Sequence, residues 1–468
     1  DSAQVSLTVP VVTNWNTEYQ VIDLGTLGGT NVAATGINDA GQVVGWSQIS
    51  TGHTQAFVWA NGTLTGLGFL PGGTSSVATA INNHGEIVGT ADVSGTNFHA
   101  FLYIPNTLVD LGTWGGPHSQ ALGINDNTEV TGWSYPPPGS NFYFGPYLWR
   151  SNQFIGITPY HNKETAGGLG INSNGYIAGY TVLDIPHSNR SWPMIWWDAN
   201  SNGLHDQGEM KVLGTLGGQW GVATAINASG QIVGWASTNY ASSWPRHAFL
   251  VTPSNGVWNL PNYSNIQTTN LLMRDLGALG SPTNNSFANG LNDHGWVVGM
   301  ATRPSQTNQA FLWRDGIMTN LNDLIAATSG WVLTNATGIN NQNEICGTGL
   351  YEGSPRAFVL RQEGHISRIT SHMESGGIQI YTNEFDQVVT QELEHVETQI
   401  IEWVGIWRSN ANSSVTFTVE YCDRLNNHNW QPFPPTSQWP ITQTLWTNTE
   451  VNASPTRFFR VRARELIP

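Results

Sequence analysis

The sequence predicts an all-β fold: a seven-bladed β-propeller closed by an N-terminal strand and followed by a small C-terminal β-sandwich-like domain. A tripeptide of Gly or Ala, then Ile or Leu, then Asn occurs seven times, with its asparagines at Asn38, Asn82, Asn125, Asn172, Asn227, Asn292 and Asn340. Successive asparagines are 44, 43, 47, 55, 65 and 48 residues apart. A period near ~45 residues with β-type units is typical of a propeller and not of a helical solenoid.

Each unit opens with a hairpin signal. The Asn begins a short polar turn that usually ends in Gly, as in Asn38-Asp39-Ala40-Gly41. The Asn side chain can bond the backbone two residues on, and the Gly supplies a positive φ. Thr128 and Asn343 take the Gly position in two units. Asn tolerates the left-handed region, whereas Thr is expected to be strained there or to form a different turn.

A β-branched strand with a glycine at a fixed place follows every turn. These glycines are Gly45, Gly89, Gly132, Gly179, Gly234, Gly299 and Gly347. A glycine at one place in seven strands implies a β-bulge or a close approach of two backbones.

The third strand of each unit carries large apolar residues, as in Ala56-Phe57-Val58-Trp59, which we expect to fill the space between blades. Two copies contain His99-Ala100-Phe101 and His247-Ala248-Phe249. On this tripeptide, residues 19–362 resemble the HAF-repeat family of bacterial extracellular proteins. The resemblance implies a repeat and an exported protein, with little chemistry. Five copies lack the His, so it is not a shared ligand.

The fourth strand ends in Leu-Gly, and its first copy, Asp23-Leu24-Gly25, precedes the first tripeptide. No such copy follows Leu360. The N-terminal strand is therefore expected to complete the last blade and to close a ring of seven blades with four strands each.

The expected domains are an N-terminal extension (1–18), the propeller (19–362) and a C-terminal β-sandwich-like domain (363–468). Apolar residues alternate over 415–421 and 459–463, as in half-buried strands, whereas 391–403 fits a strand or a helix. Residues 4–9 also alternate. This segment could lie on its own C-terminal domain, or it could be donated to a neighbouring subunit and build a homo-oligomer or filament.

Composition indicates a secreted protein. Charged residues make up 10% of the 468 residues and the net charge is -15, which argues against a nucleic-acid partner. No apolar run approaches the ~18 residues of a membrane-spanning helix. The sequence reads as a mature extracellular or cell-surface form after signal removal. Cys346 and Cys422 could be buried thiols or could link the domains.

One segment has the spacing of a calcium loop. Residues 198–209 resemble the twelve-residue EF-hand loop, with Gly203 at its sharp bend. The expected ligands of a structural calcium ion are Asp198, Asn200, Asn202, the carbonyl of Leu204, Asp206 and Glu209. His205 stands where the EF-hand usually has an apolar residue, and no flanking helix is expected. An isolated loop with three carboxylates predicts a dissociation constant of roughly 10⁻⁴ to 10⁻³ M.

Long aromatic loops between second and third strands are expected on the face of the inter-blade connections, where they could bind a polysaccharide or pack on neighbouring loops. The possible ligand face comprises Tyr143, Tyr160, His161, His187, Arg190, Trp192 and Trp244. Some of these residues could serve a polysaccharide lyase, although no catalytic motif is present.

From these patterns we expect a calcium-stabilised, non-enzymatic propeller with a structural, adhesive or filament-assembly role. A lectin-like carbohydrate-binding protein is the alternative, and a polysaccharide lyase the more distant one. No catalytic residue is assigned.

Overall fold

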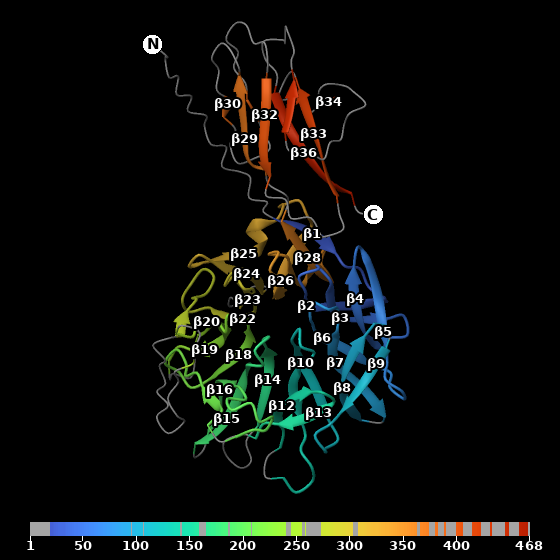
Figure 1. The fold of residues 1–468 in the computed structure, drawn as a ribbon, viewed down its shortest axis with the longest axis vertical. Helices are drawn as coiled ribbons and strands as arrows, with labels where there is room; N and C mark the ends of the chain where they lie inside the picture. The colour runs from blue at the N-terminus through green and yellow to red at the C-terminus, as the bar shows by residue number, and fades with distance from the viewer. Residues whose placement is uncertain are drawn as a thin grey trace. The chain divides into compact units, whose positions relative to one another are not determined.

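The computed structural model describes residues 19–94, 96–105, 107–140, 143–158, 165–185, 188–206, 208–239, 245–254, 258, 273–302 and 308–362, together with strands beyond them. It confirms the seven-bladed propeller. Seven four-stranded antiparallel sheets are arranged as blades, with strand order following the chain in six of them (Figure 1).

Blades one to three follow each other along the chain. Blade one consists of β2 (Gly28–Ile37), β3 (Val43–Ile49), β4 (Thr54–Ala60) and β5 (Thr63–Gly68). Blade two consists of β6 (Ser76–Ile81), β7 (Ile87–Ser94), β8 (Asn97–Ile104) and β9 (Thr107–Gly112). Blade three consists of β10 (Ser119–Ile124), β11 (Val130–Ser134), β12 (Gly145–Arg150) and β13 (Gln153–Gly156).

Blades four to six repeat this pattern. Blade four consists of β14 (Ala166–Ile171), β15 (Ile177–Ile185), β16 (Ser188–Trp196) and β17 (Met210–Val212). Blade five consists of β18 (Gly221–Ile226), β19 (Ile232–Ser237), β20 (Arg246–Val251) and β21 (Met273–Asp275). Blade six consists of β22 (Asn285–Leu291), β23 (Val297–Thr302), β24 (Gln309–Arg314) and β25 (Ile317–Asn320), followed by the 3-10 helix η2 (Leu321–Leu324).

Blade seven joins the two ends of the ring, as the sequence predicted. It consists of β26 (Trp331–Ile339), β27 (Ile345–Tyr351), β28 (Ser354–Gln362) and, as its outer strand, β1 (Tyr19–Asp23). The Leu24 N–H donates to the Ala357 carbonyl over 3.1 Å just beyond β1. In Figure 1 the blue β1 lies beside the orange β28.

The fixed glycine of each second strand faces a bulge in the first strand. In blade five, the β18–β19 register shifts between Ala223 and Ala225, directly opposite Gly234. A Cβ built on Gly234 would lie 1.9 Å from the Val222 carbonyl oxygen. The same shift occurs in all seven blades. Both parts of the prediction, the bulge and the close backbone approach, are therefore confirmed.

The first-strand turns share one conformation even where the sequence departs from Gly. Thr128 has φ 60° and Asn343 has φ 61°, so both adopt the left-handed region. The Thr128 N–H donates to the Asn125 carbonyl over 3.1 Å, as the glycines of other copies do. The Thr128 hydroxyl also donates to Glu86 of blade two over 2.8 Å. The strained alternative is the correct one, and this inter-blade bond offsets part of the strain.

The Leu-Gly and His-Ala-Phe motifs connect blades. Gly277 has φ +75°, and its carbonyl accepts from the hydroxyl of Ser286 in the next blade over 2.5 Å. The same hydroxyl accepts from the N–H of Ala248 over 2.8 Å. His247 pairs with Asp275 at 2.9 Å. The repeated residues thus hold the ring together, and the His has a structural partner.

The interior matches the expected packing of third-strand residues. The aromatic side chains of Phe57, Phe101, Phe249, Phe311 and Phe358 are all fully buried. Cys346 is a buried free thiol in blade seven, and burial raises its pKa to about 12. The propeller unit spans Tyr19–Arg361.

The C-terminal part contains eight strands in two four-stranded sheets. One has the order β30 (Ile380–Tyr381), β29 (Ile366–Met373), β32 (Gln399–Gly405) and β35 (Leu445–Asn448). The other has the order β31 (Val388–Val389), β36 (Phe458–Leu466), β33 (Ser414–Cys422) and β34 (Gln431–Pro432). Residues 399–403 are strand, whereas 391–398 lie outside the described residues.

The predicted apolar alternation of the C-terminal part corresponds to paired strands. In the β33–β36 register, Phe417 pairs with Ala463 and Val419 pairs with Val461. The proposed donor segment, residues 4–9, lies outside the described residues. In the described part of the chain, no helix has the length and apolar character needed to cross a membrane.

Candidate functional site

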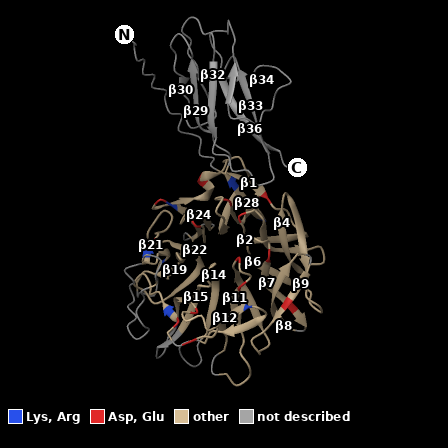
Figure 2. Cartoon of the chain, viewed as in Figure 1, with Lys and Arg blue, Asp and Glu red and all other residues tan. Residues whose placement is uncertain are grey.

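One face of the propeller carries the turns between first and second strands and those between third and fourth strands, because each blade is an antiparallel meander. The other face carries the remaining loops and the connections between blades. The structure places a cleft, the central mouth and the candidate calcium loop on the first of these faces. Charged residues are sparse along the strands and turns of the ring (Figure 2).

Seven buried asparagines surround the central mouth, and we call them the asparagine ring. The side-chain amide of each donates to the backbone carbonyl of the asparagine in the next blade, over 2.9 to 3.1 Å. The members are Asn38, Asn82, Asn125, Asn172, Asn227, Asn292 and Asn340. The motif that revealed the fold therefore closes a continuous circle of inter-blade hydrogen bonds.

A second, more exposed set of residues follows the asparagine ring. The carboxylate of Asp39 accepts from the N–H of Asn341 over 2.8 Å, and Asp126 accepts from the N–H of Asn83 over 2.8 Å. Asn341 also donates its amide to Asp39 and Asp293 over 3.1 and 2.9 Å. These carboxylates are occupied in joining blades, so the mouth itself has a structural explanation.

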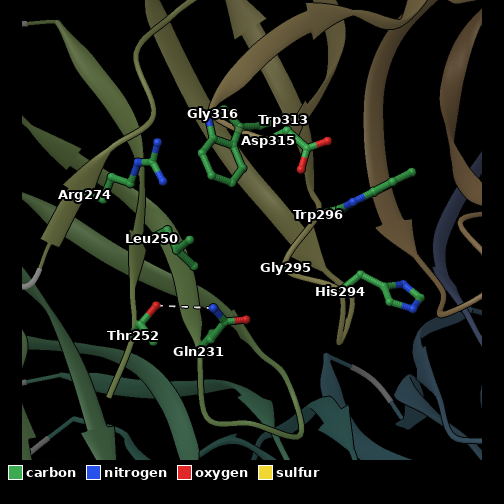
Figure 3. A pocket seen from close by; sticks show the side chains of 10 residues that line it. All are labelled: Gln231, Leu250, Thr252, Arg274, His294, Gly295, Trp296, Trp313, Asp315 and Gly316. Carbon is green, nitrogen blue, oxygen red and sulfur yellow. Dashed lines mark hydrogen bonds between the residues drawn. The ribbon is translucent and has the colours of Figure 1, made fainter. Parts of the chain in front are cut away.

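A cleft of about 430 Å³ lies between blades five and six (Figure 3). Leu250 and Trp313 are buried in its floor, being 8% and 5% exposed. Trp296 is half-buried in its wall. The rim is polar; its exposed residues are Arg274, Thr252, His294, Asp315 and Gly316, and its half-buried residues are Gln231 and Gly295. An apolar floor with a few polar rim groups is the usual make-up of a small-molecule site.

Two rim charges lie on opposite sides of Trp313 in Figure 3. The guanidinium of Arg274 lies 4.8 Å from the centre of the Trp313 ring. Neither Arg274 nor Asp315 forms an ion pair within the part of the chain that the structure describes. The amide of Gln231 donates to the Thr252 hydroxyl over 3.3 Å, which leaves the hydroxyl proton available to a ligand.

The calcium-like loop bends as its sequence requires. Gly203 has φ +76°, and its N–H donates to the Asp198 carboxylate over 2.9 Å. The amides of Asn200 and Asn202 both donate to Asp206, over 2.7 and 2.6 Å. These bonds lower the pKa of Asp206 below its ordinary 3.8, with the Asn200 bond the largest cause. The side chains named as ligands therefore converge on one another.

Glu209 closes the loop from its last position. It is 4% exposed, and its two carboxylate oxygens accept from the N–H groups of Ala199 and Asp206, each over 2.9 Å. Arg150 of blade three pairs with Asp198 at 3.0 Å. No group of three or more His, Cys, Asp or Glu side chains among the described residues is arranged to hold a metal ion. The donor types fit calcium, but the carboxylates are held by protein hydrogen bonds and by Arg150.

His205 explains how a single loop of this type is held without flanking helices. Its Nδ1 accepts from the indole N–H of Trp196 over 3.0 Å, and its ring bonds the backbone of Thr158. Burial is the largest cause of a lowered pKa for His205, which favours the neutral ring. The departure from the EF-hand pattern thus anchors the loop on the propeller.

The predicted ligand face is only partly brought together. Tyr143 is 65% exposed and Arg190 is half-buried, so both can meet a ligand. Trp192 is 2% exposed, and this burial corrects the expectation of an exposed ring at that position. It begins a run of β16, residues 192–196, in which every residue is buried. The remaining predicted residues lie outside the described ones; they are Tyr160, His161, His187 and Trp244.

A half-buried aromatic cluster lies at blades two and three, on the face that carries the connections between blades. Phe98 and His118 stack with ring centres 4.3 Å apart. Trp133 lies 5.1 Å from Phe144, which in turn lies 6.0 Å from Tyr135. The aromatics of these loops therefore pack mainly on one another, as the structural alternative in the sequence analysis required.

The cleft between blades five and six was not predicted from the sequence. One feature of the sequence could have indicated it. The residue directly before the second strand of blade six is Trp296, and no other blade has a tryptophan at this position. That position holds Gln42, Glu86, Glu129, Tyr176, Gln231 and Glu344 elsewhere. A large aromatic residue at the edge of a strand can form a binding wall, but its neighbours were not predictable from one sequence.

These observations define a seven-bladed propeller protein with a polar-rimmed cleft between two blades. The chain belongs to the family DUF3466, described as "Protein of unknown function", whose match covers residues 117–381. The matched range runs from blade three into the C-terminal strands. None of the curated proteins matches the chain. The HAF-repeat resemblance stays a separate prediction.

Several solved propeller structures are similar to this chain at low identity. An Aleuria aurantia lectin mutant in complex with Fucα1-6GlcNAc is 12% identical, covers 63% of this chain and 96% of its own, and gives a TM-score of 0.29. Trypanosoma rangeli sialidase is 10% identical, with 87% and 92% coverage and a TM-score of 0.34. A GH43_12 protein from a capybara gut metagenome is 10% identical, with 82% and 92% coverage and a TM-score of 0.26. Likeness at this level assigns no activity to the chain.

The expectation that the protein is not an enzyme is corrected. Sialidases and a GH43_12 protein, which are enzymes, are among the structures that this chain resembles. The absence of a familiar motif was the ground for excluding catalysis. Propeller enzymes assemble their sites from loops of different blades, so a single-sequence motif search does not exclude them.

Proposed function

We propose that this protein is an extracellular carbohydrate-binding propeller and that the cleft between blades five and six holds the sugar. The observation that carries the proposal is the combination of a Trp296 wall, an apolar floor and a polar rim around about 430 Å³. Ligand pockets commonly measure roughly 300–1,000 Å³. The cleft therefore has the size for a sugar of one or two rings.

The lining residues match the two chemical faces of a pyranose. The guanidinium of Arg314 lies over the half-buried indole of Trp296, 5.0 Å from its centre, and the part of the indole that faces the cleft can pack on the apolar C–H face of the ring. The Asp315 carboxylate can accept hydrogen bonds from sugar hydroxyls, while Arg274 and the Thr252 hydroxyl can donate. Such a site on a rigid ring would hold the protein on a polysaccharide, in keeping with the expected adhesive role.

Calcium is part of the same proposal as a structural ion of blade four. Asp198, Asn200, Asn202, Asp206, Glu209 and the Leu204 carbonyl would hold it. Support comes from the convergence of both Asn amides on Asp206 over 2.7 and 2.6 Å. The ion would cross-link the first and last residues of this loop.

The experiment is a titration of the intact protein against a panel of neutral and acidic oligosaccharides. Replacing Trp296 by Ala should weaken binding about tenfold or more, because aromatic packing contributes about 0.5–1.5 kcal/mol beyond the buried area. Trp235→Ala is the matched control, since Trp235 is also half-buried and lies beside an arginine, Arg246, at 5.0 Å. Absence of binding to every glycan, or loss in the control alone, would refute the proposal.

A further inference from the structure

At two other junctions between blades, an arginine has an acidic partner. Between blades seven and one, Arg361 lies 5.5 Å from the centre of the Trp59 ring and pairs with Glu344 at 2.9 Å. Between blades three and four, Arg150 pairs with Asp198 at 3.0 Å and with Glu129 at 3.8 Å. At both junctions the positive charge of the arginine is neutralised within the protein.

The groove between blades five and six differs at the position of the acidic partner. Gln231 stands in blade five where Glu344 and Glu129 stand in blades seven and three. Arg274 is exposed, lies over Trp313 and has no carboxylate partner among the described residues. On a chain with net charge -15, an uncompensated guanidinium at the rim of a cleft is a local positive site.

We propose that the cleft between blades five and six selects sugars that carry one carboxylate, with Arg274 as the residue that binds the carboxylate. This inference rests on the proposed sugar-binding function. A guanidinium can form two parallel hydrogen bonds to a carboxylate, which also fixes the ligand's orientation. With the acid group held at Arg274, the ring lies toward Trp296 and its hydroxyls face Asp315.

Asp315 restricts the ligand further. Its carboxylate is exposed at the rim and is not paired within the described part of the chain. A second anionic group on the sugar ring would approach this carboxylate and be repelled. A sugar ring with one acid group and free hydroxyls, such as a uronic acid residue, suits both side chains. Its carboxylate can pair with Arg274, and its hydroxyls can donate hydrogen bonds to Asp315.

The test compares uronic acid oligosaccharides with their methyl esters, which keep the shape and lose the charge. Short oligomers of galacturonate, glucuronate, mannuronate and guluronate are titrated against the intact protein at fixed salt. At least one acid should bind about tenfold or more tightly than its ester. Arg274→Gln should bring this ratio close to one while binding of the ester persists. Arg274→Lys should recover only part of the ratio, because an ammonium lacks the planar pair of donors.

Arg246→Gln is the matched control, because Arg246 also lies over a tryptophan but outside the cleft. An unchanged acid-to-ester ratio in Arg274→Gln overturns the inference. If acid and ester bind equally and Trp296→Ala abolishes the binding of both, the selection for acids is wrong. The cleft would still be a sugar site. No binding of either form overturns the proposed function as well. Sulfated neutral-sugar oligomers form the last arm, and binding of these instead of the uronates would identify sulfate as the recognised anion.

Discussion

The side-chain amide of Asn340 donates a 2.9 Å hydrogen bond to the backbone carbonyl of Asn38, which lies 302 residues away in the sequence. This bond is the last member of the asparagine ring and joins blade seven to blade one. Asn340 also donates to Glu344 over 2.8 Å and accepts from the N–H groups of Gln342 and Glu344. Its side chain is 4% exposed, so all of its polar groups are satisfied inside the protein.

Replacing Asn340 should therefore destabilise the closure of the ring. Asn340→Ala removes a buried donor and is expected to cost about 1–3 kcal/mol of unfolding free energy. Asn340→Asp keeps the shape but places a carboxylate against the Asn38 carbonyl and Glu344, so it should cost more than Ala. Chemical denaturation measures the difference. Asn83→Ala, in the exposed second set, is the control and should cost less. A milder effect of Asp than of Ala would contradict the donor role.

The fold was predictable because its determinants are local and repeated. A bulge-facing glycine such as Gly234 recurs in every unit, and a turn glycine such as Gly41 and the Leu-Gly of Asp23-Leu24-Gly25 recur in most units, so a single sequence contains internal controls. The site was less predictable because it depends on departures from the repeat. Trp296 and Gln231 come from different blades, and only the closed ring brings them together.

The sequence shows which loops carry aromatic residues, but it did not predict which of these side chains are exposed. Trp192 and Tyr143 occur in similar loop-rich contexts, yet one is 2% and the other 65% exposed. Trp192 lies in a run of β16 that is buried throughout, residues 192–196, whereas Tyr143 precedes β12. The sequence does not identify the exact first residue of a strand. A shift of one residue moves each side chain to the opposite face of the sheet.

A second prediction separates steric clash from backbone strain at two glycines of blade five. A Cβ at Gly234 would lie 1.9 Å from the Val222 carbonyl oxygen, whereas at Gly277, with φ +75°, it would meet nothing within 4 Å. Gly234→Ala must displace a backbone and should cost at least about 3 kcal/mol, at the upper end of overpacking effects. Gly277→Ala should cost about 1–2 kcal/mol for a left-handed alanine. Denaturation midpoints of the two variants measure the two losses of stability. A larger loss in Gly277→Ala than in Gly234→Ala would contradict the prediction.

The His247–Asp275 pair predicts a stability difference that depends on pH. Burial alone would lower the pKa of His247, but the bond and charge of Asp275 outweigh it and raise this pKa above 6.5. Burial would raise the pKa of Asp275, but the His247 bond, the bond from the Gly277 N–H and the His247 charge together outweigh it and lower this pKa below 3.8. The histidine contribution is therefore full below about 6.5 and is lost as pH rises through the folded pKa. The aspartate contribution is present above 3.8 and is lost as pH falls through its folded pKa.

His247→Gln tests this pair, because Gln55 and Gln309 occupy the same position in blades one and six. The stability lost in this variant should be largest between about pH 4 and 6.5 and should shrink on either side. Urea denaturation of both proteins across pH 3 to 9 measures the difference. A difference that is constant over this range would show that the charge pair does not contribute.

The last prediction concerns calcium and the arginine that competes for its loop. At roughly 10 mM calcium and a dissociation constant of roughly 10⁻⁴ to 10⁻³ M, binding should stabilise the protein by about 1.5–3 kcal/mol. Replacing Asp206 by Asn and Glu209 by Gln together removes two carboxylates and should abolish this effect. Calorimetry with and without a chelator measures it. Equal shifts in the wild type and the double variant would refute the site.

Arg150→Gln gives the opposite change at the same loop. Arg150 lies 3.0 Å from the Asp198 carboxylate, where its positive charge repels a cation and occupies a ligand oxygen. Without it, Asp198 is free to bind the ion, so calcium affinity should rise several-fold even though the protein without calcium loses an inter-blade ion pair. Arg361→Gln is the control, because Arg361 pairs with Glu344 at 2.9 Å in a groove with no proposed ion. Tighter calcium binding in Arg150→Gln alone would place the ion at Asp198, whereas weaker binding would mean that Arg150 holds the loop in its binding conformation.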